Sequence, residues 1–287
     1  MDERYLEPVS CDLCGCAKQR VLFRTRDTTT YWRAKCAEVD GLDAEMEFPV
    51  VECEQCSHVF VSPRLRPEIV ADIYARFWKS FEPTEMPRDE FAIYLCRQLA
   101  ELRGQPGKLL DFGSGWGSYL YAAKQIGWDA IGIEVDTAKI DFARRYGVTA
   151  MKGDLLDRQF EESSFDAVIA QQVFEHLYDP VAYLKEVRRI LKPGGVLFIS
   201  VPNYGGIAAR VSGQRWEMVS PVGHVRYFTR RTLAHMLEEH GFTVVRKRYV
   251  KRFEKGSVRN AVYQLIVFVE NELNIYPHNL SLYARRE

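Results

Sequence analysis

The pattern of residues 108–202 constrains the fold more than any other part of this chain. We read as buried strands five short apolar segments: KLLDF, DAIGIEV, VTAMKG, FDAVIAQ and VLFISVP. Between them, residues 117–126 and 137–146 are expected to form helices, and Asp179, followed by proline, is expected to cap a third. Strands that alternate with helices predict a mostly parallel sheet with helices on both faces.

A glycine-rich turn, LLDFGSGWGSYL at residues 109–120, joins the first strand to the first helix. Gly113, Gly115 and Gly117 stand at every second position, and such a turn lets a ligand approach the main chain. The carboxylate of Asp111 stands two residues earlier and would repel a phosphate group. It suits instead a ligand that carries an ammonium or sulfonium charge.

Two further carboxylates follow the next strands. Glu134 ends the second strand, where it can accept both hydroxyls of a ribose. Asp154 follows the third strand and can receive the exocyclic amine of adenine, although it could also be only a turn residue. Asp136 is an alternative ribose ligand, unless it caps the next helix. Together these features indicate a nucleoside that carries a positive charge and no phosphate, which points to S-adenosylmethionine.

Five motifs resemble, in order, those of class I S-adenosylmethionine-dependent methyltransferases: LLDFGSGWGSYL, IGIEVD, KGDLLD, FDAVIAQQVFEHL and LKPGGVLFISVPN. The resemblance covers roughly residues 108–250. It implies an α/β Rossmann-like methyltransferase fold, a seven-stranded and mostly parallel sheet whose final strand is antiparallel. The sequence agrees, because FTVVRKRYV and LSLYARR read as two more strands, separated by a helix with apolar residues from 258 to 273.

The resemblance also implies roles for single residues. Asp111, Gly113 and Gly115 would line the methionine and ribose side, Leu155 would meet the adenine beside Asp154, and Gln171 would border the sulfonium. S-adenosylhomocysteine would be the product. The predicted cofactor-binding residues are Asp111, Gly113, Gly115, Gly117, Glu134, Asp154, Leu155 and Gln171.

Four of the seven cysteines form two CxxC pairs, Cys11/Cys14 and Cys53/Cys56, with the spacing C-x2-C-x38-C-x2-C. The first residues, MDERYLEPVS, lack the apolar core of a signal peptide, so we expect a cytoplasmic protein. In a reducing compartment paired cysteines are more often metal ligands than disulfides. The pattern therefore predicts a four-thiolate Zn²⁺ site, whose closed tetrahedron leaves no position for catalysis.

The sequence around these pairs, CDLCG and VECEQCSHVFVSPR, resembles the zinc-ribbon head of a bacterial methyltransferase group. Either Cys16 or His58 could replace one ligand, and the zinc would be structural. Sugar C-methyltransferases of that group carry a further C-terminal domain, which this chain is not expected to have. We expect a zinc-binding head at 1–66, a helical connector at 67–105 and a methyltransferase domain at 106–287.

Two histidines are the predicted catalytic residues. In open α/β sheets ligands bind outside the carboxyl ends of the strands. His176, preceded by Glu175, follows the fourth strand, and His224 follows the fifth, so both map to that rim. A histidine titrates near neutrality and can take a proton from an acceptor. The alternative for each is a structural hydrogen bond.

Residues 203–228 form a long irregular stretch that we expect to be a lid on the acceptor site. Its aromatic and arginine side chains suit a planar or anionic acceptor, or they pack against the zinc head. These are Tyr204, Arg215, Trp216, Arg226 and Tyr227.

The amino-acid composition limits the kinds of binding partner that we expect. Lysine plus arginine and aspartate plus glutamate number 39 each, so net charge attracts neither nucleic acid nor an anionic membrane. The longest apolar run, QLIVFV at 264–269, is far shorter than the ~20 residues of a membrane span. The basic run 246–255 could touch nucleic acid or be a solvated strand face.

The sequence predicts an S-adenosylmethionine-dependent methyltransferase of a small-molecule acceptor, modified on oxygen, nitrogen or carbon. The alternatives are an RNA or protein methyltransferase, and a non-methylating enzyme that cyclises the methionine moiety of the same cofactor. The oligomeric state and the acceptor stay open.

Overall fold

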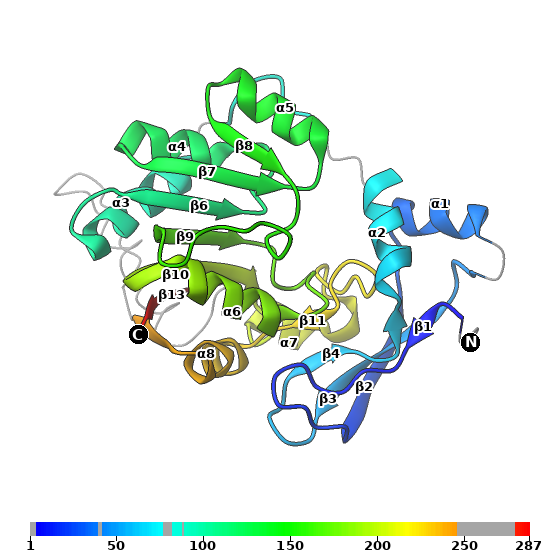
Figure 1. The fold of residues 1–287 in the computed structure, drawn as a ribbon. Helices are drawn as coiled ribbons and strands as arrows, with labels where there is room; N and C mark the ends of the chain where they lie inside the picture. Colours follow the sequence, from blue (N-terminus) through cyan, green and yellow to red (C-terminus); the bar gives the residue numbers. More distant parts are fainter. Residues whose placement is uncertain (1–3, 40–41, 77–81, 88, 246–278) are drawn as a thin grey trace, which may run out of the picture.

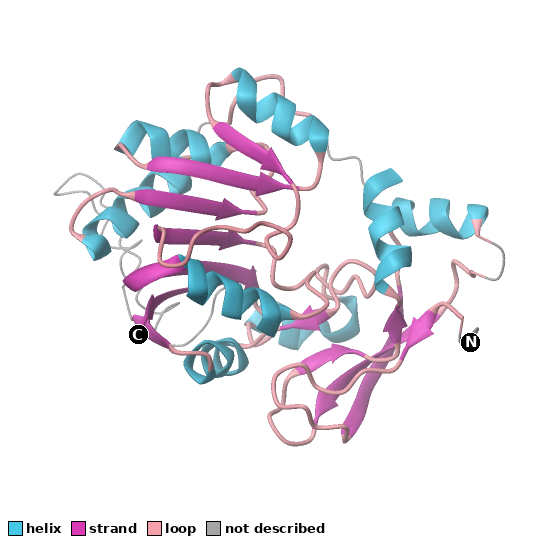
Figure 2. Ribbon diagram, in the orientation of Figure 1, coloured by secondary structure: helices cyan, strands magenta, loops and turns pink. Residues whose placement is uncertain are grey.

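The computed structural model describes residues 4–39, 42–76, 82–87, 89–245 and 279–287. Within them, helices cover a seven-stranded sheet, and a four-stranded sheet near the N-terminus forms a separate lobe (Figures 1 and 2). The seven strands are β6 (Lys108–Phe112), β7 (Asp129–Glu134), β8 (Thr149–Lys152), β9 (Phe165–Gln171), β10 (Leu191–Pro202), β12 (Phe242–Val245) and β13 (Asn279–Arg286).

The strand order of the large sheet is β12-β13-β10-β9-β6-β7-β8. The pairs from β10 through β9, β6 and β7 to β8 are parallel, and β13 is antiparallel to both β10 and β12. The predicted fold class is thereby confirmed. The chain runs outward from β6 to β7 and β8, then returns to β9 on the other side of β6, which creates a switch point where ligands bind in such sheets.

Helices lie on both faces of this sheet (Figure 1). Apolar side chains of α3 (Glu90–Arg103) and α4 (Ser118–Ile126) share one core cluster with β6, β9 and β10. On the opposite face α6 (Pro180–Ile190) and α8 (Arg230–Glu239) share another. A further helix, α5 (Thr137–Arg145), packs with α4 and β8. Alternate residues of a strand point to opposite faces, which is why β6 contributes to both clusters.

The expected helix caps are present. Asp179 Oδ1 accepts a hydrogen bond from the Ala182 N–H at 2.9 Å, and Asp136 Oδ1 accepts one from the Ala138 N–H at 2.9 Å. Asp136 therefore caps α5, the alternative to a role as ribose ligand. Such caps satisfy N–H groups that have no partner within the helix.

The N-terminal lobe, which we call the head, contains a sheet of order β11-β4-β3-β2. Its elements are β1 (Leu6–Glu7), β2 (Gln19–Arg26), α1 (Thr30–Glu38), β3 (Glu47–Cys53), β4 (Val59–Val61), β5 (Arg64–Leu65) and α2 (Pro67–Arg76). The fourth strand, β11 (Arg226–Tyr227), comes from far along the chain and pairs antiparallel with β4.

Residues 203–228 differ from our expectation of an irregular stretch, since they contain α7 (Ile207–Ser212), a 3₁₀ turn and β11. The aromatic side chains of Trp216 and Tyr227 are buried in one cluster with Trp32 and Phe48 of the head. These rings stabilise the junction between the two lobes, so they do not face an acceptor. Packing against the head, the alternative reading, is what the structure shows for them.

Some expectations fall on residues outside the described ranges. The end of the strand that begins at Phe242, the basic run 246–255, the helix at 258–273 and the run 264–269 all lie there. Within the ranges that the structure describes, no helix is long and apolar enough to cross a membrane.

Candidate functional site

The glycine-rich turn after β6 uses its glycines in two ways. A Cβ on Gly113 would lie 2.6 Å from Val173 Cγ2, and one on Gly117 would lie 2.7 Å from the Ala143 Cβ. Packing inside the protein therefore explains both of these residues. A Cβ on Gly115 would meet nothing within 4 Å, and its φ of +50° is left-handed. Of the three, Gly115 is the one beside open space.

The carboxylate of Glu134 holds this turn against the end of β7. Its Oε2 accepts the Gly115 N–H at 2.8 Å, and its Oε1 accepts the N–H groups of Val135 at 2.8 Å and Asp136 at 3.1 Å. Each carboxylate oxygen can accept two hydrogen bonds, so Oε2 keeps one lone pair for a ribose hydroxyl. The predicted ribose ligand thus also shapes the turn.

Two buried acceptors lie without donors at the switch point. Asp111, at the end of β6, is 1% exposed, and Gln171 ends the neighbouring strand β9. Asp111 Oδ2 and Gln171 Oε1 are both buried, and neither has a hydrogen-bond partner among the described residues. An unsatisfied buried acceptor costs about 1–3 kcal/mol, which a ligand that carries donors would recover.

Burial, together with the nearby charge of Glu134, raises the pKa of Asp111 to about 8. A cation bound here would favour the ionised carboxylate and reverse that shift. These acceptors therefore fit the ammonium end of the expected cofactor, which carries hydrogen-bond donors.

Asp154, the expected adenine ligand, is held by two hydrogen bonds. Its Oδ1 accepts the Leu156 N–H at 2.8 Å, and its Oδ2 accepts the Tyr183 hydroxyl at 2.5 Å. The Tyr183 ring stacks on Phe112 with centroids 5.4 Å apart. Sequence reasoning missed Tyr183, because it lies on α6 in no motif. Leu155 is fully buried in the core, which leaves its main chain to meet an adenine.

The two predicted catalytic histidines lie together, with ring centroids 4.8 Å apart. His176 Nδ1 is 2.8 Å from the Gly223 carbonyl oxygen, and His224 Nδ1 is 2.8 Å from the Met218 carbonyl oxygen. A carbonyl oxygen only accepts hydrogen bonds, so each Nδ1 carries the hydrogen and donates it. In the neutral rings both Nε2 atoms therefore carry a lone pair. Burial lowers the pKa of each histidine, which favours that neutral form.

The neighbouring Glu175 is fully buried, and neither of its carboxylate oxygens has a hydrogen-bond partner among the described residues. Its Oε1 is 4.0 Å from His176 Nε2. Its main-chain oxygen accepts the Val225 N–H at 3.0 Å, and the Val225 oxygen accepts the Val61 N–H of β4 at 3.0 Å. The sequence placed Glu175 at the rim, but its burial was visible only in the structure.

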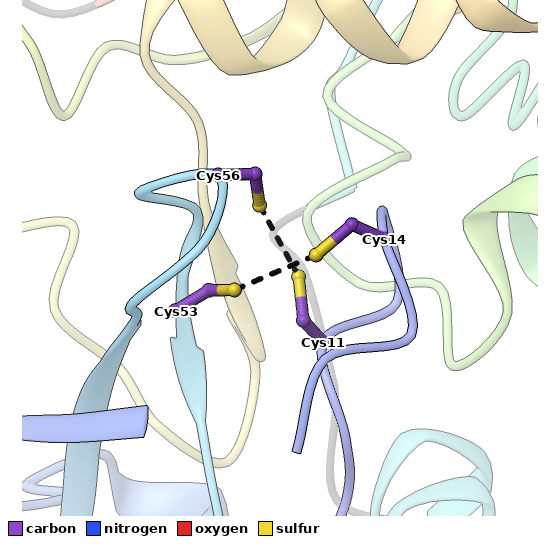
Figure 3. Close-up of side chains that lie close together, drawn as sticks. All are labelled: Cys11, Cys14, Cys53 and Cys56. Carbon is purple, nitrogen blue, oxygen red and sulfur yellow. Dashed lines mark hydrogen bonds between the residues drawn. The ribbon is translucent and has the colours of Figure 1, made fainter. Parts of the chain in front are cut away.

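The four cysteines of the two CxxC pairs meet in the head (Figure 3). The Sγ atoms of Cys11 and Cys56 are 3.5 Å apart, as are those of Cys14 and Cys53. All four lie within 4.8 Å of one another. Tetrahedral zinc with bonds of about 2.3 Å would place sulfurs about 3.8 Å apart, so the arrangement fits the ion.

The two CxxC turns share one geometry. Gly15 and Ser57, which directly follow the second cysteine of each pair, both have positive φ angles, of 71° and 62°. Cys16 and His58, the two alternative ligands, are not part of this group of sulfur atoms. Cys16 Sγ donates to the Lys18 oxygen at 3.7 Å, and the buried His58 ring packs against the rings of Phe60 and Phe228. The four thiols that converge are therefore those of the CxxC pairs.

A buried ion pair joins the head to the rim. Arg226 of β11 is 1% exposed, and its Nη2 is 2.7 Å from Oδ2 of Asp12, which lies between Cys11 and Cys14. The same nitrogen donates to the Tyr178 oxygen at 2.9 Å. The first CxxC turn thus contacts the strand that begins two residues after His224.

A second link comes from Asp27, at the end of β2. This carboxylate is 1% exposed, and its Oδ2 accepts the Ser220 hydroxyl at 2.8 Å and the Val222 N–H at 3.1 Å. The loop that carries His224 is therefore held from the head on both sides.

Comparisons with known proteins agree with this geometry. A family model described as a methyltransferase domain matches residues 87–247. A protein of Mycolicibacterium smegmatis named "Probable S-adenosylmethionine-dependent methyltransferase" is 34% identical over 134 residues, which are 46% of this chain and 49% of that protein. A ubiquinone biosynthesis O-methyltransferase of Cereibacter sphaeroides is 32% identical over 42% of this chain and 51% of its own length.

The match spans about half the length of these curated relatives. The fold recurs in the crystal structure of a SAM-dependent methyltransferase from Archaeoglobus fulgidus, with a TM-score of 0.50 and 20% identity over 69% of this chain and 94% of the other. The family match begins after the head and covers every strand of the large sheet except β13.

Proposed function

This chain belongs to the methyltransferase domain family, and from that premise we propose that it transfers a methyl group from S-adenosylmethionine to a small-molecule acceptor. The observation that carries the proposal is the pair of buried acceptors without donors, Asp111 Oδ2 and Gln171 Oε1, at the switch point of the sheet. An ammonium group supplies donors and a positive charge, which is the combination these atoms lack.

The roles of the residues follow from their positions. Asp111 and Gln171 would accept from the methionine ammonium, Glu134 from a ribose hydroxyl, and Asp154 from the adenine amine. Gly115 leaves room for the ligand beside the turn. The cofactor supplies an electrophilic methyl group on a sulfonium. The protein's share is to hold both reactants in line, which can contribute about 7–11 kcal/mol.

We propose that His176 and His224 promote loss of the acceptor's proton, because both present an Nε2 lone pair at the carboxyl rim. A small acceptor is supported by the chain's equal numbers of positive and negative side chains. It is also supported by the relatives named as ubiquinone biosynthesis O-methyltransferases. Residues 203–228 would contribute a wall of the acceptor site through the loop that carries His224, because this histidine lies beside His176 at the rim.

For the head we propose a structural Zn²⁺ held by Cys11, Cys14, Cys53 and Cys56. Zinc with four thiolates is closed to substrates, and it would stabilise a lobe with a small core. All seven cysteines are free thiols in the structure, which suits a reducing compartment such as the cytoplasm. The domain bounds 1–66, 67–105 and 106–287 belong to the same proposal.

The test is calorimetric titration with S-adenosylmethionine. We expect Asp111→Asn and Glu134→Gln each to weaken binding by about 10- to 100-fold, since hydrogen bonds to charged groups are worth about 1.5–3 kcal/mol. The matched control is Asp129→Asn, an exposed residue at the opposite end of β7, which should bind as the wild type does. Unchanged affinity in both site variants would remove the proposed cofactor site.

A second arm separates methyl transfer from other uses of the cofactor. The protein is incubated with S-adenosylmethionine alone and the products are identified by mass spectrometry. Methylthioadenosine formed without an acceptor would indicate attack within the methionine moiety and contradict the proposal. Methyl transfer yields S-adenosylhomocysteine, and only when an acceptor is present.

A further inference from the structure

Three potential ligand side chains converge beside the cofactor rim. One ligand atom from each of Glu175, His176 and His224 lies within 4.8 Å of the others. Glu175 and His176 come from the loop after β9, and His224 comes from the loop before β11. The fold therefore brings two distant segments together at one point.

Both imidazoles are oriented as metal ligands usually are. A metal-bound histidine donates its other ring N–H to a carbonyl or carboxylate, which fixes the ring and leaves one lone pair for the ion. His176 and His224 do this through Nδ1, to the carbonyl oxygens of Gly223 and Met218, both at 2.8 Å. The lone pair of each neutral ring is on Nε2, and the Nε2 of His176 lies 4.0 Å from Oε1 of Glu175.

The carboxylate of Glu175 lacks what a buried charge requires. It is 0% exposed, and no donor contacts either oxygen in the part of the chain that the structure describes. A buried carboxylate without a partner is costly, and buried charges are normally paired or coordinate a metal. Two neutral imidazoles cannot donate from Nε2, so neither histidine offers a hydrogen bond to this carboxylate through that atom.

We propose that Glu175, His176 and His224 bind a divalent first-row cation, such as Mn²⁺ or Zn²⁺. One cation would give the Glu175 carboxylate the partner that it lacks, and both imidazoles lie close enough to complete the ligand set. Ligand bonds of about 2.0–2.2 Å place neighbouring ligand atoms about 3.3 Å apart. His176 Nε2 and Glu175 Oε1 are now 4.0 Å apart, so closure requires a shift of less than about 1 Å.

Three protein ligands leave a coordination position for an acceptor oxygen, as in catalytic rather than structural metal sites. The role of the cation rests on the proposed methyl transfer, whereas its binding does not. With Nε2 on the cation, the two histidines promote proton loss through the metal and not as bases, because a hydroxyl on the cation loses its proton to water more readily. Its oxygen then bonds to the methyl carbon while the carbon–sulfur bond breaks, giving a methyl ether and S-adenosylhomocysteine. The acceptor is thereby assigned to compounds with a metal-binding hydroxyl.

Manganese distinguishes this site from the thiol cluster. Soft thiolates select zinc, whereas carboxylate and imidazole ligands also accept Mn²⁺. The full chain, loaded with one zinc, is titrated with Mn²⁺, and free Mn²⁺ is measured by electron paramagnetic resonance. We expect one bound Mn²⁺ per chain.

Variants assign the ligands. Glu175→Gln and His224→Gln should weaken Mn²⁺ binding by about 100-fold or more, because changes outside the ligand set alone cost about 10–100-fold. The matched control is His240→Gln. His240 Nδ1 makes the same kind of bond, to the Met236 oxygen at 2.8 Å, but it lies directly after α8 and outside the cluster. It should bind Mn²⁺ as the wild type does.

Thermal unfolding checks that the variants fold. Ligands that bind only the folded state stabilise it, so Mn²⁺ should raise the melting temperature of the wild type and not of Glu175→Gln. Without Mn²⁺, Glu175→Gln should be about as stable as the wild type, since the amide replaces the carboxyl at nearly the same size. No Mn²⁺ or second Zn²⁺ bound to the wild type, or equal binding by Glu175→Gln, overturns the inference.

Activity then separates the two proposals. If metal-depleted protein that keeps its thiolate zinc methylates its acceptor at the full rate, the inference is wrong and the proposed function stands. If Mn²⁺ binds as described but S-adenosylmethionine does not bind, the site exists and the proposed function fails.

Discussion

The thiol cluster of the head and the carboxyl rim of the large sheet are both sites built from polar side chains, and they differ in closure. In the head, four Sγ atoms converge and face one another (Figure 3). At the rim, Asp111, Gln171 and Glu175 have buried oxygens that accept a hydrogen bond from no described residue. Four protein ligands complete a tetrahedron, whereas isolated buried acceptors need a partner from outside.

The contrast shows how this protein divides its tasks. On the proposed assignment, the zinc of the head is closed to substrates and stabilises structure, while the rim keeps acceptors for ligands that bind and leave. The two are coupled, because Arg226 contacts Asp12 of the first CxxC turn and lies two residues from His224. We expect damage to the head to disturb the acceptor side of the rim more than the cofactor side.

The largest expected effect is loss of the zinc. Structural zinc sites bind with apparent free energies of about 10–16 kcal/mol, so Cys53→Ser should lose the metal and unfold β2, β3 and β4. Metal analysis and circular dichroism measure this, with Cys36→Ser, a head cysteine outside the cluster, as control. S-adenosylmethionine affinity should change little. Full metal content in Cys53→Ser, or equal damage in both variants, contradicts the thiolate assignment.

The next largest effect concerns the link between the two regions. Asp12→Ala leaves the charge of Arg226 buried without its ion partner, and breaking a buried pair costs about 3–5 kcal/mol. The control is Glu52→Ala, which breaks the pair with Arg20, whose side chain is 68% exposed. Exposed pairs are worth about 0–1 kcal/mol. Urea unfolding of both variants compares them, and equal losses would show that the link is not buried in solution.

A smaller effect is the pH dependence at Asp111. Burial raises its pKa to about 8, so the folded protein holds a proton that the unfolded chain has released above about pH 4. Stability from this group is therefore present at low pH and is lost as pH rises through 8.

Cofactor binding should show the opposite dependence, since the cation needs the ionised carboxylate. We expect affinity for S-adenosylmethionine to rise by up to about tenfold per pH unit between pH 6 and 8. Titration calorimetry in buffers of different ionisation enthalpy would detect the released proton. Asp111→Asn should bind weakly and without this slope, and a slope retained in that variant would assign the proton to another group.

The smallest effect is at the cap of α6. Asp179→Ala removes the hydrogen bond to the Ala182 N–H and should lower the free energy of unfolding by about 1 kcal/mol. Cofactor affinity should be unchanged, because Asp179 is a cap and not a ligand. A loss of cofactor affinity without a loss of stability would mean that the loop before α6 belongs to the cofactor site.

Much of the fold could be predicted because its signals are local. The strands β6 to β10 are short apolar runs, and the caps Asp136 and Asp179 directly precede their helices. The pairing of β11 with β4 could not be predicted, because a strand of two residues has no periodicity. Tyr183 was missed for a similar reason, since its contact with Asp154 joins a helix to a loop.

The site shows the same division. Carboxylates at strand ends identified Asp111 and Glu134, because strand ends of a parallel sheet share one edge. The glycine motif predicts three residues beside a ligand; the structure adds that a Cβ on Gly113 or Gly117 would collide with a neighbouring side chain, whereas one on Gly115 would meet nothing within 4 Å. Whether a Cβ would collide depends on neighbours that are distant in sequence.

By itself, the sequence determined the alternation of strands and helices, the acidic strand ends and the two CxxC pairs, since periodicity and short spacing express chemistry over a few residues. Only the tertiary structure decided which groups are buried without partners. That depends on packing between remote segments, such as the loops that bring Glu175, His176 and His224 together. A pattern along the chain can name a charged residue, but the loss of water around it is a property of the folded protein.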